Sequence, residues 1–327
     1  MTGSPIIPGS PPPESATAEA HAVALPWHPP YDWAFVTGFL ARRLIPGVET
    51  LGPQGYCRAV RLDAGGRAHA GRVRVQADTA RGVLRVRFDA ALAPVAGPLQ
   101  ARLVRLFDLD CQPAAVAAGL GALAAQAPGI RVPGAFDGFE LAVRAVLGQQ
   151  VSVAAAHTLA GRLARRFGMP LGDLRAGRGA GDRGPRADAD ADADAGPQWV
   201  FPSAADLAGR EPAELAECGL IRQRAAAIVA LARAIRDQGL RLAPDAPLTQ
   251  TMETLRAIPG IGDWTAQYIA MRALGWRDAF PAGDLVLMRA LGASTPARAR
   301  AAAERWRPWR AYAVMHLWRG SAISPAD

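Results

Sequence analysis

The chain contains no lysine. All 37 basic residues are arginines, and 29 acidic residues leave a formal net charge of +8. An enzyme that cleaves DNA through a Schiff base needs an amine nucleophile, usually a lysine with a lowered pKa. The absence of lysine therefore argues against an enzyme of this kind. A basic chain suits a polyanion such as DNA. The exclusive use of arginine also fits a biased nucleotide composition, so charge alone does not identify the partner.

Cysteines and long apolar runs are also scarce. Cys57, Cys111 and Cys218 are far apart and form no CxxC pair, which argues against a disulfide framework, a zinc site and an iron–sulfur cluster. No apolar run reaches 18 residues, and Met1 to Ala24 lacks a basic region ahead of an apolar stretch. We expect neither secretion nor a membrane partner, and a cytoplasmic, nucleoid-associated location.

The apolar patterning predicts an α+β fold in two parts. Residues 1–24, rich in proline and small residues, are expected to be a disordered tail. Residues 25–110 are expected to form an α+β domain, because residues 57–62, 72–76 and 83–89 alternate as in a half-buried antiparallel sheet. A helical domain is expected over 111–322, with no strand after about residue 94. Its low-complexity insertion, 172–198, includes the Ala-Asp repeat of Ala187 to Ala195.

Helical periodicity is the main signal of the second part. The expected helices are 99–107, 112–125, 136–147, 151–167, 204–217, 221–238, 252–257, 264–274 and 298–319.

A hairpin motif stands between two of these helices. Pro259, Gly260 and Gly262 suit a tight turn that approaches another molecule closely. Asp263 is the expected N-cap of the helix that starts at Trp264. Free N–H groups at such a helix start favour an anion such as phosphate. A simple helix–turn–helix connection is the alternative.

Asp284 and several aromatic residues are the candidate chemical groups. Asp284 precedes Leu285-Val-Leu-Met288 and can be a helix cap, a catalyst, or both. The aromatic residues Trp264, Tyr268, Trp318 and Phe39 can equally belong to an ordinary core.

Taken together, these segments resemble a known family. Ile258 to Tyr268, Asp284, Glu304 to Arg310 and His316-Leu-Trp318 are similar to the AlkA-type helix-hairpin-helix DNA glycosylases, the 3-methyladenine DNA glycosylase II type. The likeness continues upstream through Pro29 to Trp33, Arg105 to Leu109 and Val143 to Gln149. It covers residues 25–320 apart from the insertion.

The resemblance implies a monofunctional base-excision enzyme that hydrolyses the N-glycosidic bond of alkylated bases in double-stranded DNA. It implies a TATA-binding-protein-like N-terminal domain and a monomer. Asp284 matches the catalytic aspartate. Trp264, where lyase members carry a lysine, joins Tyr268, Trp318 and Phe39 at the base pocket. The implied DNA-binding residues are Pro259, Gly260, Gly262, Thr265, Gln149 and Gln150.

No cofactor is implied for the chemistry. The main-chain carbonyls of Arg256, Ile258 and Ile261 are implied ligands of a structural Na⁺ or K⁺ at the hairpin.

Two departures from the family pattern concern specificity. Gln150 stands where well-known members have a leucine wedge, and Leu285 follows the catalytic carboxylate where a tyrosine is common. We expect these changes to alter lesion preference.

Two other functions compete with this one. A non-catalytic helix-hairpin-helix protein that binds damaged DNA would keep the hairpin without needing Asp284 and the aromatic set. A bifunctional glycosylase/lyase would need the missing lysine.

Overall fold

The computed structural model describes residues 21–149, 151–175 and 196–321. Its N-terminal part is an antiparallel five-stranded sheet in the order β1-β5-β4-β3-β2. The strands are β1 His21–Pro26, β2 Glu49–Gly52, β3 Gly55–Ala64, β4 Arg67–Asp78 and β5 Val83–Phe88. In β5, Leu84, Val86 and Phe88 are buried while Arg85 and Arg87 face outward, as the alternation predicted.

The first strand corrects the expected tail. Residues 21–24 belong to β1, which pairs with β5 from His21 opposite Phe88 to Pro26 opposite Val83. The segment is short and ends in a proline, so propensity alone did not distinguish it from the tail; pairing with β5 makes it a strand. Residues 1–20 of the expected tail lie outside the described residues.

The rest of the chain is mainly helical. The N-terminal helices are α1 Trp33–Ala41, η1 Ala90–Val95 and α2 Ala96–Leu106. Those that follow are α3 Pro113–Leu120, α4 Ala122–Ala125, α5 Gly138–Leu147, α6 Val153–Phe167, α7 Leu171–Arg175, α8 Ala204–Ala208, α9 Pro212–Ala216 and α10 Arg222–Asp237. The last are α11 Leu248–Ala257, α12 Asp263–Arg272, α13 Leu285–Ala290, α14 Pro296–Ala303, η3 Glu304–Trp306 and α15 Arg310–Ser321.

Three of the expected helices are divided. Gly121, with a positive φ of 56°, separates α3 from α4. Gly209 caps α8 before Pro212 opens α9. Pro308, which has no N–H to donate, lies between η3 and α15.

The expectation of no late strand is wrong. Strands β6 Met169–Pro170 and β7 Trp199–Val200 form a two-residue ladder. They bracket the expected insertion, of which residues 176–195 lie outside the described residues. The flank of this segment is part of the fold, because Arg72 Nε donates to the Pro197 carbonyl at 2.9 Å.

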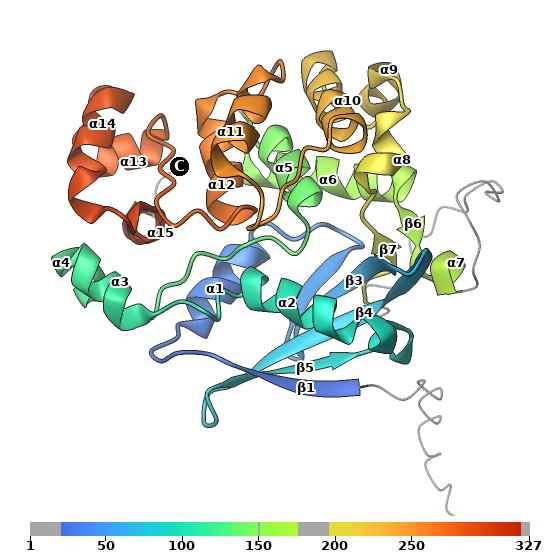
Figure 1. Cartoon of the computed structure of the whole chain (residues 1–327), viewed down its shortest axis with the longest axis horizontal. Helices are drawn as coiled ribbons and strands as arrows, with labels where there is room; N and C mark the ends of the chain where they lie inside the picture. The colour runs from blue at the N-terminus through green and yellow to red at the C-terminus, as the bar shows by residue number, and fades with distance from the viewer. Residues whose placement is uncertain (1–20, 150, 176–195, 322–327) are drawn as a thin grey trace, which may run out of the picture.

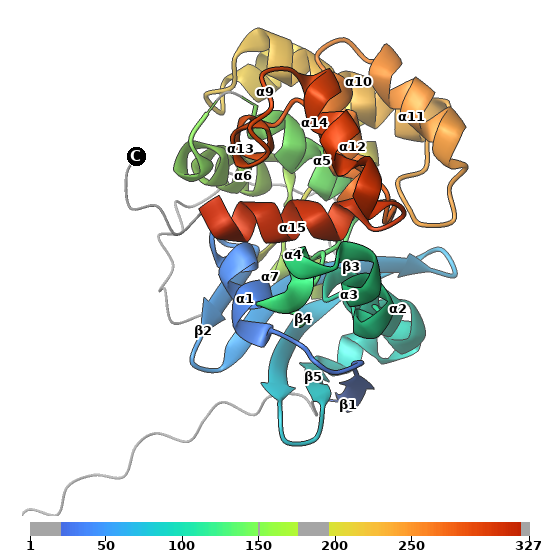
Figure 2. The same ribbon diagram turned by 90° about the vertical axis from the view of Figure 1, so that its left-hand side faces the viewer.

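Figure 1 shows the sheet in the lower half of the molecule and most helices above it. In Figure 2, α15 crosses the middle, with α13 above it and α4 below. Among the described residues, none of the helices has both the length and the apolarity needed to cross a bilayer.

Candidate functional site

The hairpin lies where the motif predicted it. Helix α11 ends at Ala257, and Gly260 adopts a φ of +91°, which side chains rarely tolerate. A Cβ on Gly260 would lie 3.1 Å from the Cβ of Ala227, so the turn is packed against α10. Gly262 faces open space on its Cβ side. The α12 start is therefore accessible beside Gly262.

The N-cap assignment needs correction. Gly262 is the N-cap of α12, and Asp263 is its first residue. Asp263 instead accepts from Arg256 at 2.7 Å. A carboxylate in the first turn still interacts favourably with the helix dipole. The predicted start of the helix was therefore wrong by one residue.

Gln149 and Thr265 hold the hairpin in place through hydrogen bonds. The Gln149 amide donates to the Gly260 carbonyl and to Thr265 Oγ1, each at 2.9 Å. Thr265 is only 2% exposed, and its contact with DNA stays a prediction. Gln149 ties α5 to the hairpin, and no DNA contact is needed to explain its position. Gln150 lies outside the described residues.

Asp284 is both a helix cap and the centre of an indole cluster. Its Oδ1 accepts from Leu287 N at 3.0 Å and caps α13. The same oxygen accepts from Trp318 Nε1 at 3.1 Å, and Oδ2 accepts from Trp264 Nε1 at 3.0 Å. These three donors fix the orientation of the carboxylate.

The four predicted aromatic residues come together around one cavity of about 1050 Å³, which Asp284 also lines. The Trp264 and Tyr268 rings stack with centroids 5.3 Å apart, and Trp318 lies 6.3 Å from Tyr268. Phe39 is only 3% exposed and carries the Arg43 guanidinium 3.8 Å from its ring centroid. It is a buried wall of the cavity, whereas the two indoles remain partly exposed.

Sequence reasoning missed the arginines at this cavity, of which Arg272 and Arg43 lie at Tyr268. Arg272 Nη1 donates to the Tyr268 hydroxyl at 2.6 Å, and its other nitrogens bind the carbonyls of Pro133 and Gly134. Burial alone would raise the pKa of Tyr268, but Arg272 and Arg43 lower it below its usual value. The i,i+4 spacing of Tyr268 and Arg272 was the available signal.

His316 was also missed as a cavity residue. It is 8% exposed and lines the same cavity. Burial lowers the pKa of His316 to about 4, with the Arg319 charge acting in the same direction. The imidazole is therefore neutral near pH 7.

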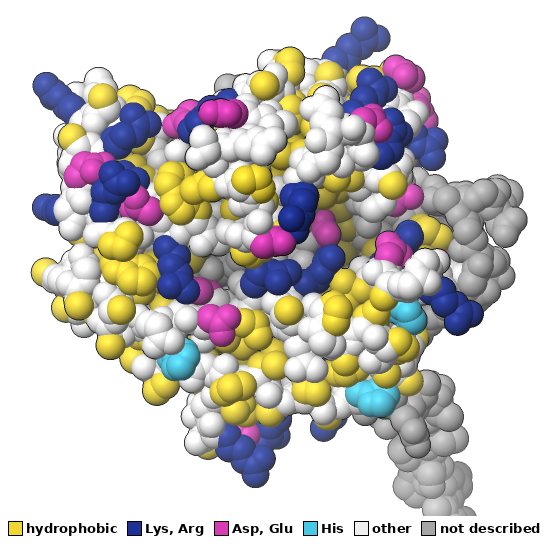
Figure 3. All heavy atoms as spheres, viewed as in Figure 1, with side chains coloured by type: hydrophobic (Ala, Val, Ile, Leu, Met, Phe, Trp, Pro, Cys, Tyr) yellow, Lys and Arg dark blue, Asp and Glu magenta, His cyan; other side chains and the backbone are white. Residues whose placement is uncertain are grey.

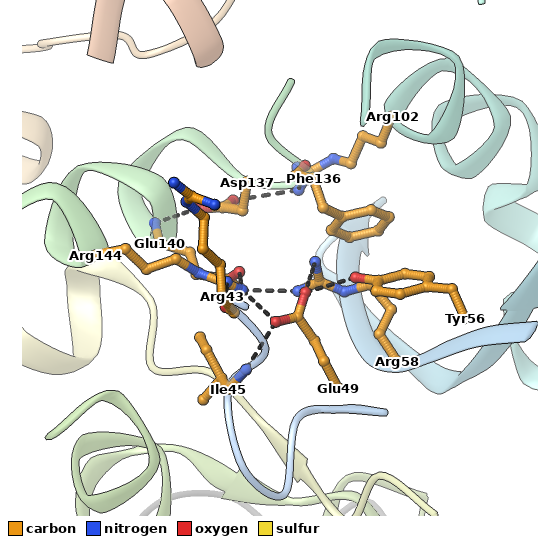
Figure 4. A network of polar contacts seen from close by, with 10 residues as sticks. All are labelled: Arg43, Ile45, Glu49, Tyr56, Arg58, Arg102, Phe136, Asp137, Glu140 and Arg144. Atoms are coloured by element: carbon orange, nitrogen blue, oxygen red, sulfur yellow. Dashed lines mark hydrogen bonds and ion pairs between the residues drawn. The ribbon is translucent and has the colours of Figure 1, made fainter. Parts of the chain in front are cut away.

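A buried charge network joins the sheet to α5, the helix that precedes Gln149 (Figure 4). Arg144 of α5 binds Glu49 of β2 at 2.6 Å, and Arg58 of β3 binds Glu140 of α5 at 2.7 Å. Tyr56 also donates to Glu49. Burial opposes ionisation of Glu49, but Arg144 and Arg58 lower its pKa to about 2.

Charge on the molecular surface is mixed on the face shown in Figure 3. Arginine and acidic side chains alternate over the helical half instead of separating into patches of one sign. The overall positive charge is thus not gathered on that face.

Comparisons with known proteins identify the family. The model of the AlkA N-terminal domain matches residues 22–137, beyond the expected boundary at 110, and that of the HhH-GPD superfamily base excision DNA repair protein matches residues 143–309. The chain is 38% identical over 304 residues to DNA-3-methyladenine glycosylase 2 of Escherichia coli (strain K12), spanning 93% of this chain and 99% of that protein.

Two solved structures share the fold. A 3-methyladenine DNA-glycosylase from Archaeoglobus fulgidus aligns with a TM-score of 0.72 at 21% identity, covering 92% of this chain and 98% of that one. An 8-oxoguanine glycosylase/lyase from Clostridium acetobutylicum aligns with a TM-score of 0.64 at 14% identity, covering 93% and 98%. Family models, sequence identity and the site together show that this chain belongs to the HhH-GPD superfamily of base excision DNA repair glycosylases, with an AlkA-type N-terminal domain.

Proposed function

We propose that this glycosylase is a monofunctional, monomeric enzyme that hydrolyses the N-glycosidic bond of alkylated bases, such as 3-methyladenine, in double-stranded DNA. The observation that carries the proposal is the placement of the Asp284 carboxylate between two indole N–H donors at the wall of an aromatic cavity. A protein that only bound damaged DNA would not need this group.

The cavity suits a cationic base. An alkylated purine must leave the base stack to be reached, and a poorly stacked base does so at lower cost. N-alkylation places positive charge on the ring, which the electron-rich faces of Trp264 and Trp318 attract. Such a base is also a good leaving group, so no strong acid is required to protonate it. His316, neutral near pH 7, adds no further positive charge to that of the cavity arginines.

Asp284 would act on the sugar. The C1′–N bond breaks with its electron pair leaving on the base, and positive charge develops on the deoxyribose. The Asp284 carboxylate stabilises that charge and orients water, whose oxygen bonds to C1′ as Asp284 accepts its proton. The products are the free base and an abasic site.

A lyase mechanism is disfavoured by the residues themselves. Trp264 occupies the position beside Asp284 that lyases give to lysine, and the whole sequence has no lysine. Trapping with borohydride on abasic-site DNA should therefore give no covalent adduct. A stable adduct would support the bifunctional alternative.

The hairpin would bind a phosphate of the DNA backbone through the N–H groups at the start of α12, beside Gly262. A Na⁺ or K⁺ on the carbonyls of Arg256, Ile258 and Ile261 would complement this contact. The last carbonyls of α11, which ends at Ala257, lack partners within the helix. The Ile258 carbonyl accepts from Ile261 N at 3.0 Å, which leaves its second lone pair for such an ion.

Asp284→Asn tests the proposal most directly. The variant keeps the size of the side chain but loses the full negative charge. We expect it to bind abasic-site DNA like the wild type and to lose release of 3-methyladenine from methylated DNA by at least about a hundredfold. Release at the wild-type rate would refute the assignment and favour the non-catalytic binding protein.

A further inference from the structure

Large apolar side chains that face solvent gather at the mouth of the cavity. Within residues 21–149, 151–175 and 196–321, four such side chains are exposed: Val153 by 51%, Ile221 by 56%, Leu285 by 76% and Val286 by 36%. Val153 and Val286 line the cavity, and Leu285 lies between Asp284 and Val286 in the chain. A single exposed leucine is ordinary. Three of four at one opening require an explanation.

These side chains come from two helix starts that border the same cavity. Leu285 is the first residue of α13, and Val153 is the first residue of α6. Residues of α13 and α6, among them Val286 and Val153, line the same cavity. Both starts are fixed by caps: Asp284 accepts from Leu287 N, and Ser152 accepts from Ala155 N. The apolar groups are therefore held in place beside the carboxylate.

Leu285 points away from the cavity. It is absent from the cavity wall, which Val286 lines in its place. The effect of Leu285 on lesion preference stays a prediction. Its side chain faces the solvent outside the mouth of the cavity.

We propose that Leu285 and Val153 are apolar wedges that enter the DNA duplex beside the extruded nucleotide. This inference rests on the proposed function. Extruding a base leaves the apolar faces of its neighbours uncovered, and apolar side chains inserted at base steps cover such faces and kink the duplex. Arg42, Arg289 and Arg319 also line the cavity and can contact the flanking phosphates.

The test uses the full chain with Leu285→Ser and Val153→Ser, singly and together. The probe is a duplex with a tetrahydrofuran abasic analogue and 2-aminopurine beside it, whose fluorescence rises on unstacking. We expect the wild type to raise the signal and the double variant to give less than about half that rise at saturation. In base release from N7-methylguanine DNA, kcat/KM should fall about tenfold on the duplex, equivalent to about 1.4 kcal/mol. It should change less than about twofold on the same single strand.

Controls separate a wedge from a general defect. Leu285→Met keeps an apolar side chain and should retain the fluorescence rise. Ile221→Ser removes an exposed side chain that does not line the cavity and should match the wild type. Equal losses on duplex and single strand, or an unchanged fluorescence rise in the double variant, would overturn the inference. If the wild type releases no base, the proposed function fails, while the fluorescence measurement still tests the wedge.

Discussion

Trp318 donates its indole N–H to Asp284 Oδ1 across 34 residues of sequence, at 3.1 Å. Trp264 holds the other carboxylate oxygen, so the two indoles fix the plane of the group. The aromatic residues of the site therefore have two functions. Their faces line the base cavity, and their N–H groups orient the carboxylate that acts on the sugar.

Trp318→Phe separates these two functions. The variant keeps an aromatic ring but loses the N–H donor. A hydrogen bond to a charged group contributes about 1.5–3 kcal/mol, so we expect kcat for base release to fall by about tenfold, with a smaller change in KM. Single-turnover kinetics on methylated duplex DNA measure the effect. Trp309→Phe, outside the cavity, is the matched control, and equal rates for the two variants would contradict the orienting role.

Gly262 offers a cleaner test of phosphate binding than Gly260. Gly260 has a positive φ and its Cβ would press on Ala227, so any side chain there also strains the turn. Gly262 has φ −81° and open space, so Gly262→Asp adds a negative charge without strain. We expect Gly262→Asp to weaken binding to any DNA sequence by about tenfold at low salt, and Gly262→Ala to change it little. Fluorescence anisotropy over a salt series measures both, and equal affinities would exclude the anchor.

Asp108 and His316 have opposite effects on stability as pH changes. Burial raises the pKa of Asp108 to about 6. The native state then binds more protons than the unfolded state, and this contribution to stability falls as pH rises from about 4 to about 6. Because the pKa of His316 is lowered, its contribution is present above the unfolded pKa of about 6.5 and is lost as pH falls toward about 4.

Single variants should reveal the two opposed effects. Between about pH 4.5 and about pH 6, the free energy of unfolding of Asp108→Asn should rise more steeply with pH than that of the wild type. For His316→Gln it should rise less steeply or fall. Guanidinium unfolding followed by tryptophan fluorescence measures the slopes. Parallel slopes for all three proteins would show that neither group titrates as its surroundings indicate.

Glu49 is the carboxylate on which the buried network depends. Glu49→Gln leaves Arg58 and Arg144 short of negative charge in the protein interior, and we expect a loss of about 3 kcal/mol in the free energy of unfolding. Asp63→Asn breaks the exposed pair with Arg61 and should cost less than about 1 kcal/mol. Denaturant unfolding near pH 7 compares them. Similar small losses would mean that the network is replaceable.

Local signals located most of the site before the fold was known. The turn at Gly260, the cap at Asp284 and the alternation in β5 each depend on neighbours within a few residues, so the sequence predicted them. Strand β1 could not be predicted in this way, because pairing with a segment some 60 residues distant makes it a strand.

Long-range contacts also explain the missed residues. Arg43 follows α1 and lines the cavity together with residues of α12. Thr265 was predicted to contact DNA, and its hydroxyl accepts a hydrogen bond from the Gln149 amide. The Asp284 hydrogen bonds to Trp264 and Trp318 required three separate segments to meet. No spacing of residues in the sequence predicts that these three segments come together.

The network of Glu49, Arg58, Glu140 and Arg144 limits how this protein can be dissected. Glu49 and Arg58 lie in the segment that matches the AlkA N-terminal domain, Arg144 lies in the HhH-GPD segment, and Glu140 lies between the two. A fragment that ends between these two segments would carry charged side chains without the partners that neutralise them in the whole chain. The two halves should therefore melt together, and a truncated glycosylase half would be a poor stand-in for the whole enzyme.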